Sequence, residues 1–137
     1  MIRKIIIAIG VVIGVSLFLK FPDLDIRLLG IGAHRNFLFH SCSMVVVLYF
    51  IIRKMNPSKS YVGFLHGVVV GCGIGIGIHL LLDFFQSHPV KYPIIGSLVD
   101  GTSLDDRLWL GLNSAVSFLV SLGIYRRLRS LLLCNSQ

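Results

Sequence analysis

The chain has 137 residues, of which 55% are hydrophobic and only 14% are charged. A soluble domain carries about a quarter charged residues, so this composition argues against an ordinary water-soluble fold. The formal net charge is +7. Because the basic residues flank apolar blocks, that charge indicates membrane topology and lipid headgroups, and we expect no nucleic-acid binding. Cys42, Cys72 and Cys134 form no CxxC pair, so neither a disulfide framework nor a thiolate zinc site is expected.

Four long apolar blocks follow one another along the chain, and each block predicts a transmembrane helix. The first block ends before Pro22, because proline cannot continue a helix, and no small-residue cleavage site of a signal peptide follows it. Ser103 and Asp106, ahead of the fourth block, have the spacing of a helix-starting capping box. We therefore predict an all-α, polytopic membrane protein that forms one domain over 1–137, with helices over 5–21, 37–52, 61–85 and 108–125.

Four spans place both termini on one side of the membrane. That side carries eight of the thirteen Lys and Arg residues, so the positive-inside rule favours cytoplasmic termini. All six Asp residues and four of the five His residues fall on the opposite, non-cytoplasmic side. The potential metal ligands therefore gather on one side of the membrane, whereas the cations favour the other side by eight to five, and the lipid bilayer is the main partner.

The third block contains a glycine repeat. Gly63, Gly67, Gly71 and Gly75 recur every four residues, and small residues at this spacing let helix backbones approach closely in lipid. No predicted strand precedes the repeat, so a nucleotide-binding loop is not expected. The helix over 61–85 is thus a packing helix and a candidate surface for homo-oligomer formation.

Two ionisable residues lie at the outer end of the third block. His79 and Asp83 are four positions apart, so their side chains can converge on one point of a helix face. A carboxylate near the edge of the hydrocarbon is costly unless it has a partner. That partner is either a basic side chain, Arg35 or Lys91, or a metal ion.

Two other segments deliver similar residues to the same face. Asp23 and Asp25 follow the first block, and His34 and His40 bracket the start of the second. Each has a structural alternative: a solvated turn for the aspartates, and a neutral, hydrogen-bonded imidazole for His40. The convergence of three segments favours a metal site instead. The candidate ligands are Asp23, Asp25, His34, His40, His79 and Asp83.

Mixed imidazole and carboxylate ligands suit Zn, Mn or Fe. Six candidates exceed the four ligands of a structural zinc, so the site holds either two metals or one metal with further carboxylates behind its ligands. A bound metal lowers the pKa of water to about 7, which suits hydrolysis. The substrate would be a lipid phosphoester or another amphiphile. Arg35 could hold a phosphate, or it could extend to the headgroups instead.

Two functions without hydrolysis remain as alternatives. The chain could be a non-catalytic, oligomeric membrane module: an assembly partner, a small pore or a metal sensor. Ion or proton transport through the histidines and aspartates is less favoured, because the cytoplasmic half of the predicted bundle contains no acidic residue and offers no continuous polar path.

Three segments between the apolar blocks resemble the YdjM-like family, small bacterial and archaeal membrane proteins described as membrane-bound metal-dependent hydrolases and distant relatives of zinc phospholipase C and P1 nuclease. The segments are Pro22-Asp23-Leu24-Asp25, His34-Arg35-x4-His40-Ser41 and His79-x3-Asp83, within about residues 22–86. The resemblance implies that the same six residues bind metal, that the protein is a hydrolase, and that it lies in a bacterial or archaeal plasma membrane.

The chain departs from the family pattern in one stretch. The family has one residue fewer between its two histidines and a glycine where Asn36 stands. One additional residue rotates a helical position by about 100°. Either this segment is not a continuous helix, or only one of His34 and His40 is a ligand, in which case we expect His40.

Overall fold

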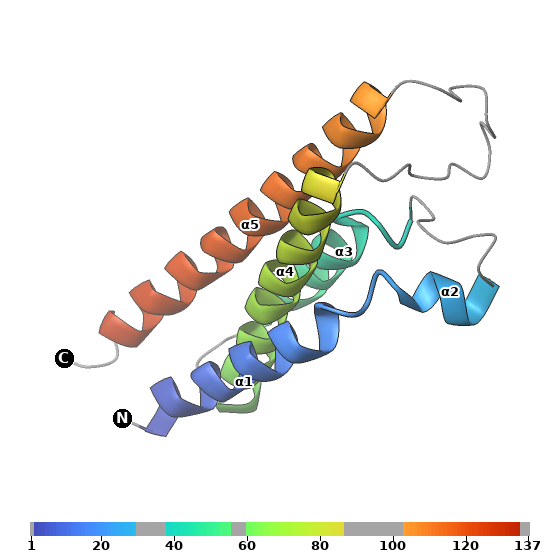
Figure 1. The fold of residues 1–137 in the computed structure, drawn as a ribbon. Helices are drawn as coiled ribbons and strands as arrows, with labels where there is room; N and C mark the ends of the chain where they lie inside the picture. Colours follow the sequence, from blue (N-terminus) through green and yellow to red (C-terminus); the bar gives the residue numbers. More distant parts are fainter. Residues whose placement is uncertain (1, 30–37, 56–59, 87–102, 135–137) are drawn as a thin grey trace.

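The computed structural model describes residues 2–29, 38–55, 60–86 and 103–134, and every regular element within these ranges is an α-helix. The prediction of an all-α fold is therefore confirmed for this part of the chain. The long helices run alternately up and down, and the start of the first lies at the same end of the bundle as the end of the last (Figure 1). The helices are α1 (Ile2–Phe18), α2 (Leu24–Leu29), α3 (Ser43–Ile52), α4 (Ser60–Gln86) and α5 (Ser103–Cys134).

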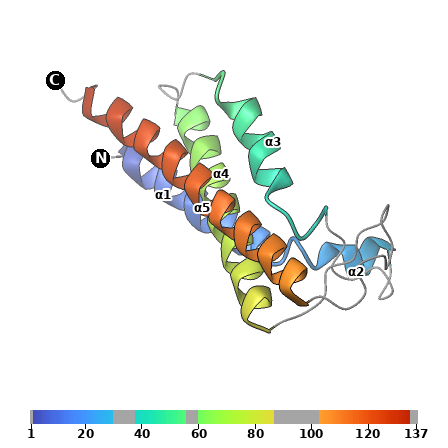
Figure 2. The ribbon, with the colours of Figure 1, turned by 90° about the horizontal axis from the view of Figure 1, so that it is seen from above.

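α4 is the central helix of the bundle. α1 and α5 pack along it, and α3 contacts both α4 and α5 (Figure 2). α4 begins and ends within one residue of the range predicted from its apolar block. Its central position explains this agreement, because a helix covered by several neighbours is apolar along its whole length.

α5 is longer than its apolar block. It begins at Ser103, where the capping-box spacing places a helix start, and it continues past the predicted end at residue 125. Arg126, Arg127 and Arg129 lie within the additional turns. Arginine is a good helix former, so these charged positions do not end α5.

α3 begins later than predicted. Its apolar block starts at residue 37, but residues 38–42 form turns and the helix begins at Ser43. The Ser41 hydroxyl donates to the carbonyl of Leu38 at 2.8 Å, and this local bond competes with helix formation. His40 therefore lies in a turn ahead of the helix, not one turn inside it.

Two of the helices, α4 and α5, are long and apolar enough to cross a membrane. α1 has 17 residues and α3 has 10, which correspond to about 26 Å and about 15 Å of helix. The hydrocarbon core of a bilayer is about 30 Å thick. The four-span topology and the orientation therefore stay predictions.

The glycines of α4 allow main chains to approach. A Cβ atom at Gly10 of α1 would lie 2.5 Å from the carbonyl oxygen of Phe64 in α4, and one at Gly71 would meet the carbonyl oxygen of Val11. Such contacts leave no room for a side chain at either position. The repeat thus packs α1 against α4 within one chain, and association between copies through it stays a prediction.

Serines of α5 provide the complementary contact on another side of α4. Ser114 donates to the carbonyl of Gly77 at 2.8 Å, and Ser121 donates to the carbonyl of Val70 at 3.1 Å. Both serines are buried. Hydroxyl-to-carbonyl bonds of this kind join helices where apolar packing alone is weakly specific.

Candidate metal centre

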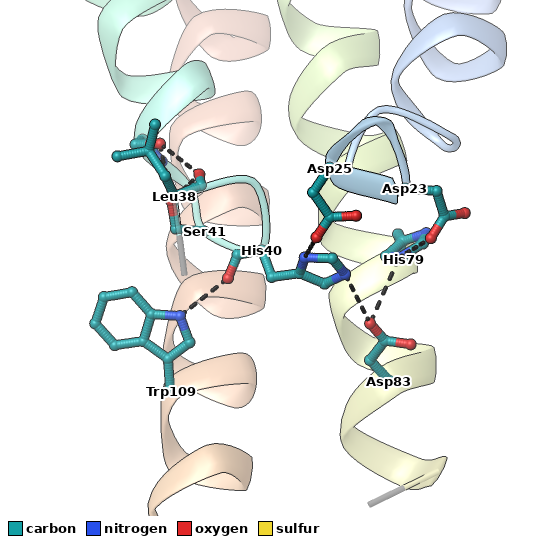
Figure 3. Close-up of polar contacts among 9 residues, drawn as sticks. Asp23, Asp25, Leu38, His40, Ser41, His79, Asp83 and Trp109 are labelled. Carbon is teal, nitrogen blue, oxygen red and sulfur yellow. Dashed lines mark hydrogen bonds and ion pairs between the residues drawn. The ribbon is translucent and has the colours of Figure 1, made fainter. Parts of the chain in front are cut away.

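The candidate centre lies at the end of the bundle where α1 ends and α4 ends (Figure 3). Five of the six predicted ligands come together there, from the segment after α1, the turn before α3 and the last turns of α4. His34 and Arg35 lie outside the described residues. The five are Asp23, Asp25, His40, His79 and Asp83.

His40 is fully buried and lies between two carboxylates (Figure 3). Its Nδ1 is 3.4 Å from Oδ2 of Asp25, and its Nε2 is 3.4 Å from Oδ2 of Asp83. The two ring nitrogens of an imidazole point in different directions, so the two carboxylates meet opposite sides of one ring. His40 therefore joins the segment after α1 to the end of α4.

His79 is oriented by the main chain. Its Nδ1 lies 2.9 Å from the carbonyl oxygen of Leu19, and a carbonyl can only accept, so Nδ1 carries the hydrogen. In a neutral ring this leaves Nε2 with a lone pair. Nε2 is buried, makes no hydrogen bond within the described residues, and lies 3.5 Å from Asp83 Oδ2 and 3.7 Å from Asp23 Oδ1.

The separations between these ligand atoms are compatible with ligands that share one metal ion. They run from 3.4 to 3.7 Å. Ligands about 2.1 Å from a tetrahedral ion lie about 3.4 Å from one another. One ligand atom from each of Asp23, His40 and His79 lies within 4.8 Å of the others, so this group could hold a metal ion.

Asp83 connects the two imidazoles. Its Oδ2 atom lies within 3.5 Å of Nε2 of both His40 and His79, whose ring centroids are 5.5 Å apart. A buried carboxylate is strongly destabilising without compensating charge or hydrogen bonds. A divalent cation could contact these three atoms at once, and protonated imidazoles could also pair with the carboxylate.

Asp23 is the exposed member of the group formed by Asp23, His40, His79 and Asp83. The side chain of Asp23 is 48% exposed, whereas that of His40 is fully buried and that of Asp83 is 11% exposed. Solvent therefore reaches the centre at Asp23.

The segment after α1 is held by packing around proline. Pro22 is fully buried, and the Phe21 ring lies 5.4 Å from that of Phe18 and 5.8 Å from that of Phe39. A main-chain bond from Leu24 to Phe21, at 3.0 Å, then leads into the short helix α2. These contacts fix the turn that carries Asp23 and the start of α2, which carries Asp25.

α5 anchors the turn that carries His40. Trp109 donates its indole hydrogen to the carbonyl of His40 at 2.9 Å, and Asn113 accepts from the main-chain N–H of Cys42 at 2.9 Å. Asn113 also donates to the carbonyl of Trp109 at 2.8 Å. Sequence reasoning missed both side chains. The signal was present, because they are the only tryptophan and a lone amide in the fourth apolar block.

No family model matches the chain, and no match to it is found among curated proteins or solved structures. The resemblance to the YdjM-like family therefore stays a prediction from its three motifs. The geometry of the five residues stands independently of that resemblance, since it follows from the packing of α1, α3, α4 and α5.

Proposed function

We propose that the chain is a membrane-embedded, metal-dependent hydrolase that acts on a phosphoester or another amphiphilic substrate at the non-cytoplasmic membrane face. The observation that carries this proposal is the convergence of two histidines and three aspartates at one end of a helical bundle. Their facing atoms lie at the separations expected of metal ligands.

The membrane location is supported by the outer surface of the helices. Leu17, Phe85 and Leu119 are 63%, 71% and 66% exposed, on α1, α4 and α5 respectively. Water-soluble monomers rarely expose large continuous apolar surfaces. We propose that α1 and α3, with the turns that flank them, cross beside α4 and α5 to complete four spans.

The charge distribution supports cytoplasmic termini. Basic residues gather where α1 begins and α3 and α5 end, whereas Asp23, Asp25 and Asp83 lie at the opposite end. Lys and Arg are enriched on the cytoplasmic side of membrane proteins. The basic residues are Arg3, Lys4, Arg53, Lys54, Arg126, Arg127 and Arg129.

The proposed ligands of one divalent ion are Asp23, His40, His79 and Asp83. When bound, Zn, Mn or Fe supplies Lewis acidity, which makes water a stronger acid and polarises a phosphoryl or carbonyl oxygen. The protein's part is to orient both Nε2 atoms inward and to leave the Asp23 side open. An exposed carboxylate beside the apolar end of α1 suits a substrate with a polar head and an apolar tail.

We further propose that the chain belongs to the YdjM-like family. The departure from the family spacing between His34 and His40 is compatible with this, because residues 38–42 are turns and the helical rotation argument does not apply to them. Arg35 lies outside the described residues, and its contact with a substrate phosphate stays a prediction.

The decisive experiment is elemental mass spectrometry of the detergent-purified protein. We expect about one Zn, Mn or Fe per chain, lost in the His79→Ala/Asp83→Ala double variant. His66→Gln is the matched control, because His66 is also a buried histidine of α4 but lies at the other end of the helix. A hydrolysis screen of phosphoesters then follows. If the protein contains no metal after reconstitution with each ion, the proposal is wrong.

A non-catalytic membrane module is the second candidate. It is favoured by the same contacts, because protonated imidazoles could pair with Asp25, Asp83 and Asp23 without any metal. This second function would be supported if the protein contains no metal and forms cross-linked oligomers in membranes. The oligomers should then persist in the His79→Ala variant.

A further inference from the structure

We propose that Asp25 is a positioning residue and not a metal ligand: it accepts the hydrogen of His40 Nδ1 and thereby presents His40 Nε2 to the metal. The inference rests on the metal binding proposed above and refines it. The sequence places Asp25 among six candidate ligands and leaves open which carboxylates lie behind the metal ligands.

The two aspartates that contact His40 lie at different nitrogens of its ring. Asp25 lies at Nδ1 and Asp83 at Nε2, each at 3.4 Å. One ion cannot bind both nitrogens of a single imidazole, because their lone pairs diverge. The carboxylate that shares Nε2 with His79 is Asp83, so the metal side of the ring is the Asp83 side and Asp25 lies behind it.

His79 has the same arrangement with a different partner. Its Nδ1 is bonded to the carbonyl oxygen of Leu19 at 2.9 Å, and its Nε2 faces Asp83. In both rings, therefore, an oxygen from the α1 side of the bundle occupies Nδ1 and leaves Nε2 for the centre. Metal-binding histidines characteristically donate their other ring hydrogen to a carboxylate or a carbonyl, which fixes the tautomer and the ring orientation.

Burial makes Asp25 suited to this task. Asp25 and His40 are both fully buried, so solvent does not compete for the 3.4 Å contact between them. A carboxylate partner also makes the imidazole a stronger ligand than a carbonyl partner does. Trp109 holds the main chain of His40 at 2.9 Å, so both the backbone and the ring of this residue are fixed.

The test compares Asp25→Asn with Asp83→Asn. Zn²⁺ affinity is measured by chelator competition, and the ligand set by the visible spectrum of the Co²⁺-loaded protein. We expect Asp25→Asn to bind one Co²⁺ with unchanged bands but to have a Kd for Zn²⁺ raised about 10- to 100-fold. Asp83→Asn should shift the bands because it replaces a carboxylate ligand with a neutral amide oxygen. A band shift in Asp25→Asn, or an unchanged Kd, overturns the inference.

A second measurement needs no substitution of Asp25. In ¹⁵N-histidine-labelled wild-type protein, the His40 signals are assigned by their loss in His40→Gln. We expect Zn²⁺ or Cd²⁺ to shift Nε2 of His40 while Nδ1 stays protonated. A shift at Nδ1 would overturn the assignment even if Asp25→Asn fails to fold. Wild-type protein that binds no metal would instead overturn the proposed function itself.

Discussion

His79 of α4 donates its Nδ1 hydrogen to the carbonyl oxygen of Leu19, 2.9 Å away, just beyond the end of α1. A helix end leaves its last carbonyl groups without main-chain donors. The same side chain therefore completes the end of one helix and directs its second nitrogen towards Asp83 and Asp23.

This double contact predicts that His79→Ala destabilises the metal-free protein, whereas Asp83→Asn does so much less. The contact is part-buried, so loss of this hydrogen bond costs about 0.5–1.5 kcal/mol. The measurement is thermal unfolding in detergent after chelator treatment. Equal losses in the two variants would show that the contact with Leu19 contributes nothing.

Removal of metal should lower the stability of the wild-type protein. A ligand present at a hundred times its Kd stabilises the native state by about 2.7 kcal/mol. We expect the unfolding temperature to fall on chelation and to recover on addition of Zn, Mn or Fe. The His79→Ala/Asp83→Ala variant should respond to neither treatment; a chelator effect of equal size there would place the metal elsewhere.

The close packing of α1 on α4 predicts that Gly71→Ala is destabilising. The added Cβ would meet the carbonyl oxygen of Val11, which is main chain and cannot rotate away, and overpacking of this kind costs about 1–3 kcal/mol. Gly123→Ala is the control, because a Cβ there has nothing within 4 Å. Thermal unfolding in detergent should show a loss of stability only in Gly71→Ala. Equal stabilities of the two variants would contradict the close contact.

The anchor from α5 predicts that Trp109→Phe weakens metal binding without removing any ligand. The substitution keeps an aromatic ring but loses the donor to the His40 carbonyl. One hydrogen bond is worth about 0.5–1.5 kcal/mol, or about 2- to 10-fold in Kd. Chelator competition measures the change, and Tyr125→Phe on the exposed face of α5 is the control. An unchanged Zn²⁺ affinity in Trp109→Phe would show that this hydrogen bond from α5 does not support metal binding.

The features that could be predicted from the sequence are those determined by short-range sequence patterns. Unbroken apolar character locates α4, and the four-residue spacing of His79 and Asp83 places both side chains on one face of it. Helix counting brings Asp23, Asp25 and His40 to the same end. These inferences need only helix periodicity and the alternation of direction between successive helices.

The remaining features depend on contacts between distant segments. In the turn ahead of α3, the main-chain N–H of Cys42 donates to Asn113, 71 residues away, and no pattern around residue 42 reveals this contact. The different places of Asp25 and Asp83 depend on which nitrogen of His40 each meets. Residue type alone cannot distinguish the two aspartates, because the ring orientation is set by α1, α4 and α5 together.

The glycine repeat has a consequence for how the bundle chooses its alignment. A motif that recurs every four residues nearly matches itself after a shift of about one helical turn, or about 6 Å, so glycine packing alone leaves neighbouring alignments of α1 on α4 close in energy. The bond from His79 to Leu19 exists in only one of them. The contacts at the polar end of the bundle thus select one register of α1 on α4, and their loss would let α1 shift along α4.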